Sequence, residues 1–393
     1  MTRSIDGSGI DKVLQQAVDS GALPHVAAIA ADADGVIYEG GAGVRIAGES
    51  DDPVGTSTMF RIMSMTKMVC TTAALQQKER GELDFDAPVE DYCPQFADLK
   101  VLEGFDGDEP ILVEPRSRAT VRQLVTHTSG LAYWFWNDSI KRYEAATGIP
   151  NVVPGSADAF KAPLTTHPGE AYTYGINTDW LGKVVEAVAG KGLDQVVEEG
   201  IAGPLGMTST TFHPDDAQRD QAVMVHVQGE DGSWSSAGSV LNPEPDWWAG
   251  GHGLYSTPRD YIRFERALLR GGELDGVRVL EEATVEAAFS NQIGDLDFPA
   301  EILTADPPIT DSFRAGPGWK WGYGLLLNTA DVPGRRRAGS GSWAGLFNTH
   351  FFIDRTTGVC ASIYTNSLPF VTPEAFGAFG DFEEALYSAL GAS

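Results

Sequence analysis

The sequence predicts an α+β protein in which both ends of the chain build one antiparallel sheet and a mostly helical segment is inserted between them. Strand-like apolar runs occur near both ends of the chain, at 25–31, 36–44, 322–328, 348–354 and 359–365. Helical patterns flank these runs, at 10–20 and 382–390. Such an arrangement favours a single sheet covered by helices. We therefore expect a sheet-plus-helices domain from 1–82 and 251–393 and a helical insertion domain from 83–250.

Each element rests on a local pattern. Residues 10–20 carry apolar side chains at helical spacing, and Gly21 follows as a stop signal. The polar residues 32–35 separate the first two apolar runs and predict a hairpin, and 355–358 predict a tight turn between the last two. Inside the insertion, the pattern predicts helices at 120–127, 177–189 and 193–200.

Composition excludes several classes of protein. A chain of 393 residues can form two domains, and its formal net charge of −27 argues against nucleic-acid or anionic membrane partners. The cysteines Cys70, Cys93 and Cys360 are too few and too scattered for a disulfide framework or a metal site, so we expect neither metal nor cofactor. Residues 1–7 lack an apolar signal-peptide core and no stretch has membrane-spanning length, which predicts a cytoplasmic protein.

The segment 60–70 is the strongest candidate for chemistry. Ser64 and Lys67 are three residues apart, so on a helix their side chains can reach each other. A desolvated lysine with a lowered pKa can take the proton of a serine hydroxyl and make it a nucleophile. From these residues alone, an ordinary helix start and a serine–lysine catalytic pair both remain open.

With three further segments, the chain resembles the serine β-lactamase and penicillin-binding-protein superfamily, and within it the class C β-lactamase-like family VIII carboxylesterases. Besides Ser64–Lys67, the segments 124–131 (LVTHTSGL), 168–174 (PGEAYTY) and 250–257 (GGHGLYST) are similar to family segments in order and spacing. The resemblance implies a serine β-lactamase/penicillin-binding-protein-like fold with an active site between the two domains.

The resemblance also implies roles for single residues. Tyr174 falls on the position of the family's second proton-handling residue, where a lysine ammonium nearby would favour the phenolate, and Tyr172 is its rival. The segment 341–346 corresponds to the family's edge strand, so the N–H groups of Ser64 and Leu346 are expected to form the oxyanion hole. Gly345, beside Ala344, lets the strand approach the substrate closely.

Two departures from the class C lactamases point to the substrate. Trp343 stands where those enzymes carry a lysine, and Ile176 where they carry an asparagine, with Asn177 one place further on. The site thereby loses a cation and an amide and gains apolar surface, which favours a neutral ester over an anionic lactam. Asn177 could still serve if a local shift brought it into the site.

Aromatic residues gather in two loops near the family segments. Tyr133–Trp136 and the pair Trp247–Trp248 either pack in the core or line a substrate pocket, and Trp134, Trp136 and Trp248 are the candidates for substrate contacts.

We therefore expect a serine carboxylesterase for a small-molecule ester. The alternatives are an amidohydrolase or acyltransferase of the same fold (β-lactamase, D-aminopeptidase, D,D-carboxypeptidase or oligoamide hydrolase) and a non-catalytic binding module. An α/β-hydrolase is disfavoured because the chain lacks a G-x-S-x-G elbow. For a Ser-His-Asp triad, His127, His252 and His350 are the candidate histidines. The oligomeric state is not predicted.

Overall fold

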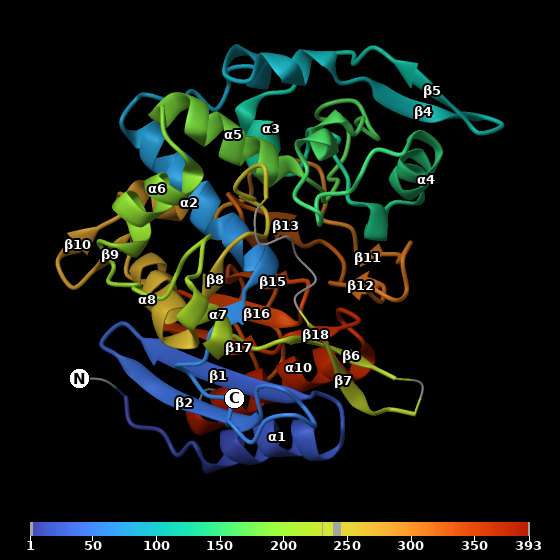
Figure 1. The fold of residues 1–393 in the computed structure, drawn as a ribbon. Coiled ribbons are helices and arrows are strands. Elements are labelled where there is room, and N and C mark those ends of the chain that lie inside the picture. Colours follow the sequence, from blue (N-terminus) through green and yellow to red (C-terminus); the bar gives the residue numbers. More distant parts are fainter. Residues whose placement is uncertain (1–2, 230, 239–244, 392–393) are drawn as a thin grey trace.

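The computed structural model describes residues 3–229, 231–238 and 245–391, so Met1 and Thr2 of the N-terminal segment lie outside the described residues. Its centre is a seven-stranded antiparallel sheet of strand order β13-β14-β15-β16-β17-β1-β2 (Figure 1). These strands are β1 (His25–Asp32), β2 (Val36–Gly43), β13 (Lys320–Trp321), β14 (Leu326–Leu327), β15 (Gly341–Gly345), β16 (Thr349–Asp354) and β17 (Val359–Tyr364). Strands from the two ends of the chain meet where β1 pairs with β17, as the sequence predicts.

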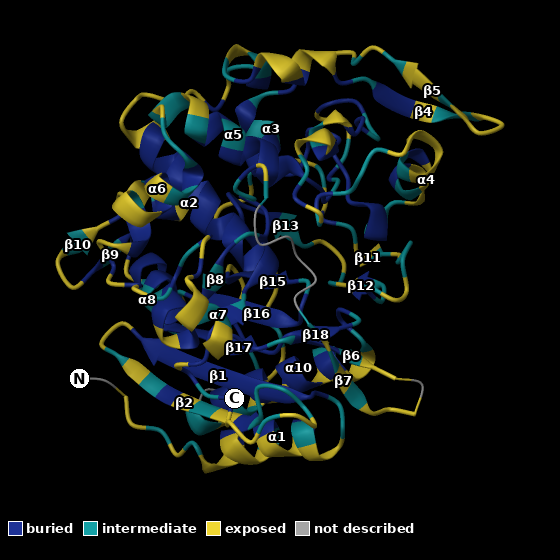
Figure 2. Cartoon of the chain, in the orientation of Figure 1, coloured by how far each residue is buried: buried dark blue, intermediate teal, exposed yellow. Residues whose placement is uncertain are grey.

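Helices cover both faces of this sheet. The helices are α1 (Ser8–Asp19), α2 (Thr66–Glu79), α3 (Val121–Val125), α4 (Asp138–Thr147), α5 (Asn177–Ala189), α6 (Leu193–Val197), α7 (Asp216–Gln221), α8 (Pro258–Leu269), α9 (Glu282–Ala288) and α10 (Pro373–Ala389). Along β1, alternate residues join two different apolar clusters: Val26 packs with α1 and α10, and Ala27 with α2 and α8. Because both faces are covered, the whole strand is buried and reads as a continuous apolar run (Figure 2).

The smaller strands form two- and three-stranded sheets outside the central sheet. They are β3 (Phe60–Arg61), β4 (Val101–Asp106), β5 (Glu109–Val113), β6 (Val225–Gln228), β7 (Trp234–Gly238), β8 (Tyr255–Ser256), β9 (Glu273–Leu274), β10 (Val277–Arg278), β11 (Glu301–Ile302), β12 (Phe313–Arg314) and β18 (Ser367–Leu368). The segment 83–250, expected to be mostly helical, contains the β4–β5 hairpin as well as the β6–β7 hairpin, and β6 pairs with β18 near the C-terminus.

Three predicted elements differ from the observed ones. The predicted strand 322–328 is interrupted by a turn, because Gly324 adopts a positive φ of 75° between β13 and β14. The predicted C-terminal helix is longer than expected and begins at Pro373, capped by the side chain of Thr372. The predicted helix 193–200 is α6 followed by a π-helical turn over Glu198–Ala202. Among the described residues, no helix is long and apolar enough to cross a membrane.

Candidate active site

Ser64 lies in a one-turn 3-10 helix, Met63–Met65, that leads directly into α2. Met63 precedes it with a φ of 46°, a conformation that a non-glycine residue adopts at a cost. The end of β15 packs against this turn: a Cβ on Gly345 would lie 2.3 Å from the Ile62 carbonyl oxygen, and Thr349 Oγ1 donates to that oxygen at 3.2 Å. Gly345 therefore serves to seat the sheet edge against the serine turn.

Lys67 is fully buried one helical turn after Ser64. Its Nζ lies 3.1 Å from Ser64 Oγ, 3.0 Å from Tyr133 Oη and 2.8 Å from the Gly251 carbonyl oxygen. A neutral amine has two N–H donors and one lone pair, so with donors directed to Gly251 and Tyr133 the lone pair is left for the Ser64 hydroxyl. Burial lowers the pKa of Lys67 to about 7, against an opposing effect of Asp179.

Asp179, on α5, accepts hydrogen bonds from Gly251 and Tyr133, the two residues that also contact Lys67. Its Oδ1 accepts from the Gly251 N–H at 2.8 Å, and its Oδ2 accepts from the Tyr133 hydroxyl at 3.3 Å. Burial raises the pKa of Asp179, while the Lys67 charge and these hydrogen bonds lower it. Asp179 and the contact of Tyr133 with Lys67 were not predicted, because neither residue lies near Ser64 in the chain.

Tyr174 completes the group around Ser64. Its hydroxyl shares a hydrogen bond with Ser64 and accepts one from Trp343 Nε1 at 3.0 Å. Burial nevertheless raises the pKa of Tyr174, and the two hydrogen bonds only partly offset it. The expectation that Lys67 favours a phenolate is not supported: Lys67 Nζ lies over the Tyr174 ring, 4.8 Å from its centroid, and the pKa of Tyr174 is raised rather than lowered.

The rival tyrosine has a different environment. Tyr172 is buried, packs against Phe298 and Trp321, and its hydroxyl has no hydrogen-bond partner among the described residues. It is therefore a packing residue, and Tyr174 is the tyrosine that the fold brings to Ser64.

A narrow cavity of about 20 Å³ opens at Ser64. Its lining is almost entirely apolar or aromatic and consists of Ser64, Phe135, Trp136, Tyr174, Phe313, Trp343, Ala344, Leu346 and Phe370. Of the predicted substrate contacts, Trp136, Trp343, Ala344 and the oxyanion-hole residue Leu346 are present. Phe313 and Phe370 were not predicted, because each reaches the cavity from a segment without any family pattern.

Four predicted substrate contacts do not line this cavity, and the first is Gly345, which packs against the Ile62 carbonyl oxygen instead. Trp134 turns its Nε1 to Asp306 at 3.0 Å, and Ile176 is buried in the core at the start of α5. Trp248 lines a separate cavity. For Trp134 the packing alternative therefore holds.

Asn177 is held inside the helical part of the molecule. Its side-chain oxygen accepts from Ser129 Oγ at 2.5 Å, and its amide nitrogen lies 3.0 Å from His127 Nδ1 and 3.2 Å from the Leu131 carbonyl oxygen. With both ends of the amide occupied and the side chain fully buried, Asn177 does not face the Ser64 cavity. It ties the 124–131 segment to α5 instead.

The three histidines proposed for a triad lie elsewhere. His127 pairs with Asn177, His252 Nδ1 lies 3.6 Å from Asp179 Oδ1, and His350 stacks on Phe379 at a centroid distance of 4.6 Å. Among the described residues, the Ser64 hydroxyl bonds Lys67 and Tyr174 and no histidine.

Comparison with known proteins agrees with this geometry. Residues 10–385 match the family model described as Beta-lactamase. A lovastatin esterase of Penicillium rubens is 33% identical over 89% of this chain and 90% of its own length, and the monacolin J acid methylbutanoyltransferase of Aspergillus terreus is 30% identical over 96% and 95%. The solved structure of an Aspergillus terreus simvastatin synthase (LovD6 mutant) superposes with a TM-score of 0.83 at 29% identity, covering 98% of this chain and 97% of that one.

A more distant structure, EstCE1, titled a hydrolase with promiscuous acyltransferase activity, has a TM-score of 0.77 at 22% identity, covers 97% of this chain and 98% of that one, and supports the fold. The predictions of a β-lactamase-like fold and of a serine hydrolase related to esterases are confirmed, and acyltransferases also occur among the relatives. This chain belongs to the beta-lactamase family.

Proposed function

We propose that the protein is a serine carboxylesterase that hydrolyses small to medium neutral esters through an acyl-enzyme on Ser64. The observation that carries this proposal is the 3.1 Å contact between Ser64 Oγ and the buried Lys67 amine, whose pKa is lowered to about 7. A base of that pKa is half neutral near physiological pH and can accept the hydroxyl proton.

In the proposed reaction, Lys67 removes the proton of Ser64 Oγ, which attacks the ester carbonyl carbon. The N–H groups of Ser64 and Leu346 stabilise the oxyanion. Tyr174 gives its proton to the leaving alkoxide oxygen as the C–O bond breaks, and regains one from the Lys67 ammonium through solvent. Water then attacks the acyl carbon and gives a proton to the neutral Lys67 amine. The bond between the acyl carbon and Ser64 Oγ breaks, the carboxylic acid leaves, and the Lys67 ammonium returns the proton to Ser64 Oγ.

Two observations support an ester rather than a lactam substrate. The amide of Asn177 is committed to Ser129 and Leu131, so it is not free for the amide of a lactam. Trp343 offers Tyr174 an uncharged donor where a lactamase has a lysine, so this position supplies no cation for a substrate carboxylate.

Acyl transfer is the second candidate, supported by the relatives named as acyltransferases. The same acyl-enzyme serves both reactions, and an alcohol takes the place of water in the last step. Adding an alcohol during ester hydrolysis and measuring the ratio of new ester to free acid distinguishes them. We also infer a cytoplasmic location, with which the three free, buried cysteines are compatible.

The function is tested with p-nitrophenyl butyrate and a chromogenic cephalosporin under the same conditions. We expect kcat/KM to be far higher for the ester and to be abolished in Ser64→Ala, with Ser8→Ala, an exposed serine, as the matched control. Mass spectrometry of the acylated enzyme should map the label to Ser64. A cephalosporin kcat/KM equal to or above that of the ester would contradict the esterase proposal, and labelling of another serine would contradict the role of Ser64.

A further inference from the structure

A cavity of about 160 Å³ lies between the central sheet and α10. Ser342 of β15, His350 of β16 and Phe379 of α10 contribute to its wall, and we call it the His350 cavity. It is much larger than the Ser64 cavity, and three wall residues belong to both: Phe313, Trp343 and Ala344. The indole N–H of Trp343 bonds Tyr174, so the His350 cavity adjoins the catalytic group.

Strand pairing places the His350 side chain on the face of the sheet that α10 covers. His350 is paired with Ala344, and Phe352 with Ser342. Directly paired residues of an antiparallel pair project to the same face, and alternate residues of one strand share that face. Phe352 packs in the apolar cluster of α1 and α10, whereas Phe351 belongs to the cluster of the catalytic helix α2. The His350 side chain therefore lies on the opposite face of the sheet from α2.

Two wall residues of this cavity carry buried nitrogen atoms that have no hydrogen-bond partner among the described residues, Arg336 Nε and His350 Nε2. Arg336 is 6% exposed and His350 is 2% exposed. Both side chains lie against one ring, because the Arg336 Cζ is 5.8 Å from the Phe379 centroid and His350 stacks on that ring at 4.6 Å. Burying a polar group without a partner is unfavourable, so a ligand that satisfies both nitrogens gains hydrogen bonds without breaking any within the protein.

These two nitrogens call for a hydrogen-bonding group rather than a counter-ion. The charge of Arg336 is already balanced, because its Nη1 donates to Glu383 Oε2 at 3.1 Å and its backbone N–H donates to Glu383 Oε1 at 3.0 Å. Burial, together with the charge of Arg336, lowers the pKa of His350 to about 3. The imidazole is therefore neutral at physiological pH.

A hydroxyl is the small group that matches both nitrogens. Arg336 Nε can only donate, whereas Nε2 of a neutral histidine donates or accepts according to which ring nitrogen carries the proton. A hydroxyl oxygen accepts and its proton donates, so it fits either form of His350. A carbonyl oxygen fits one form only, and a carboxylate would bring a second negative charge near Glu383.

The size and the walls of the cavity define the rest of the ligand. An apolar cavity of about 150 Å³ can hold benzene, so about 160 Å³ suits one aromatic ring with a small substituent. Trp319, Phe376 and Phe379 supply aromatic walls against which such a ring can pack.

We propose that the His350 cavity binds a small aromatic alcohol. The hydroxyl lies between Arg336 Nε and His350 Nε2, and the ring lies among the aromatic side chains. This site is separate from the site of ester hydrolysis, and its existence does not depend on the proposed esterase function.

The first test compares 4-fluorophenol with fluorobenzene, which differ only in the hydroxyl group, by fluorine NMR titration at pH 7. The measured quantity is the ratio of the two dissociation constants, and its change between variants cancels the different hydration of the two compounds. His350→Phe keeps a ring that can stack on Phe379 but removes Nε2. We expect the preference for 4-fluorophenol to fall about two- to twelvefold in this variant, the effect of one neutral hydrogen bond. His213→Phe, which changes an exposed histidine, is the control and should leave the ratio unchanged.

An unchanged ratio in His350→Phe would overturn the proposal. It would equally be overturned if the wild-type protein did not bind 4-fluorophenol, because the two nitrogens would then be satisfied by water alone.

The second test locates the bound ring and does not depend on the histidine. Ser342→Leu adds bulk to the cavity wall from β15 and gives up only a 3.5 Å contact with the Leu326 carbonyl oxygen. We expect this variant to lose binding of both compounds, whereas Ser8→Leu at an exposed position should retain it. Thermal unfolding of each variant checks that it is folded, and if Ser342→Leu does not fold, the His350→Phe ratio decides.

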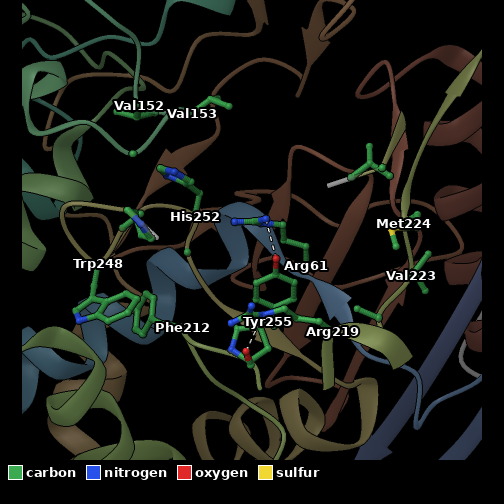
Figure 3. Close-up of a pocket in the computed structure, with 18 of the residues that line it drawn as sticks. Arg61, Val152, Val153, Phe212, Arg219, Val223, Met224, Trp248, His252 and Tyr255 are labelled. Carbon is green, nitrogen blue, oxygen red and sulfur yellow. Dashed lines mark hydrogen bonds between the residues drawn. The ribbon is translucent and has the colours of Figure 1, made fainter. Parts of the chain in front are cut away.

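The larger cavity around Arg61 and Trp248 (Figure 3) shares no lining residue with the His350 cavity. A compound bound there would keep its affinity in both His350→Phe and Ser342→Leu. That result would overturn the assignment of the aromatic alcohol to the His350 cavity.

Discussion

Replacing Trp343 by phenylalanine tests whether the indole N–H takes part in proton transfer or only fills the wall of the pocket. The substitution keeps an aromatic ring but removes the donor that lies 3.0 Å from Tyr174 Oη. That hydrogen bond lowers the pKa of Tyr174, which burial raises. Removing the donor therefore makes any negative charge on the Tyr174 oxygen harder to form.

The size of the effect depends on the charge that Tyr174 carries during the reaction. A hydrogen bond between neutral groups contributes about 0.5–1.5 kcal/mol, and one to a charged group about 1.5–3 kcal/mol. At 1.36 kcal/mol per factor of ten, the second range corresponds to a loss of roughly 10-fold to 150-fold in kcat. Because Tyr174 gives up its proton in the proposed mechanism, we expect a loss in this range.

The assay measures kcat and KM for p-nitrophenyl butyrate in Trp343→Phe and in Trp136→Phe. Trp136 lines the same cavity and contacts the Tyr174 ring, but its Nε1 points to the Asp311 carbonyl oxygen at 3.5 Å, so it controls for lost aromatic surface. Thermal unfolding should show that both variants are folded. If Trp343→Phe loses no more kcat than Trp136→Phe, the indole N–H has no part in proton transfer.

Two further changes probe the base. Lys67→Arg keeps the charge but cannot release a proton near neutral pH, so this variant should lose nearly all activity. Lys78→Arg, at the exposed end of the same helix, is the control and should retain activity. Substantial activity in Lys67→Arg would mean that Lys67 acts through its charge and not as the base. With its pKa lowered to about 7, wild-type Lys67 should make kcat/KM rise with pH up to about 7 and level off above it. Because the Asp179 carboxylate favours the ammonium, Asp179→Asn should lower that pKa and move the rising limb to lower pH; an unmoved or upward-shifted limb would contradict this coupling.

The parts of the fold that the sequence predicts are those with an uninterrupted local pattern. The helix predicted at 177–189 coincides with α5, and the strands before and after the 355–358 turn are β16 and β17. The prediction fails where glycines interrupt the helical pattern. Gly377 and Gly380 lie inside α10, so the first half of this helix was not predicted. The Thr372 cap and Pro373 mark its true start. Strand pairs such as β6 with β18 depend on long-range contacts that no local pattern carries.

The residues of the candidate site also differ in how far the sequence could predict them. Ser64 and Lys67 could be paired from their spacing, because three residues of helix fix their separation. Tyr174 and Trp343 needed the family resemblance, and the hydrogen bond between them joins residues far apart in the sequence. Asp179, Phe313 and the proximity of Tyr133 to Lys67 follow only from the folded arrangement.

The placement of positive charge links these findings. The residue next to the reacting hydroxyls is Trp343, an uncharged donor, so a carboxylate beside the scissile bond would meet no fixed cation there. Arg61 is held by Tyr255 three residues before the serine, in a separate cavity without an acidic wall residue among those described. A lactam carries its carboxylate close to the reacting carbonyl, where Trp343 supplies no cation, and this agrees with the proposed preference for esters.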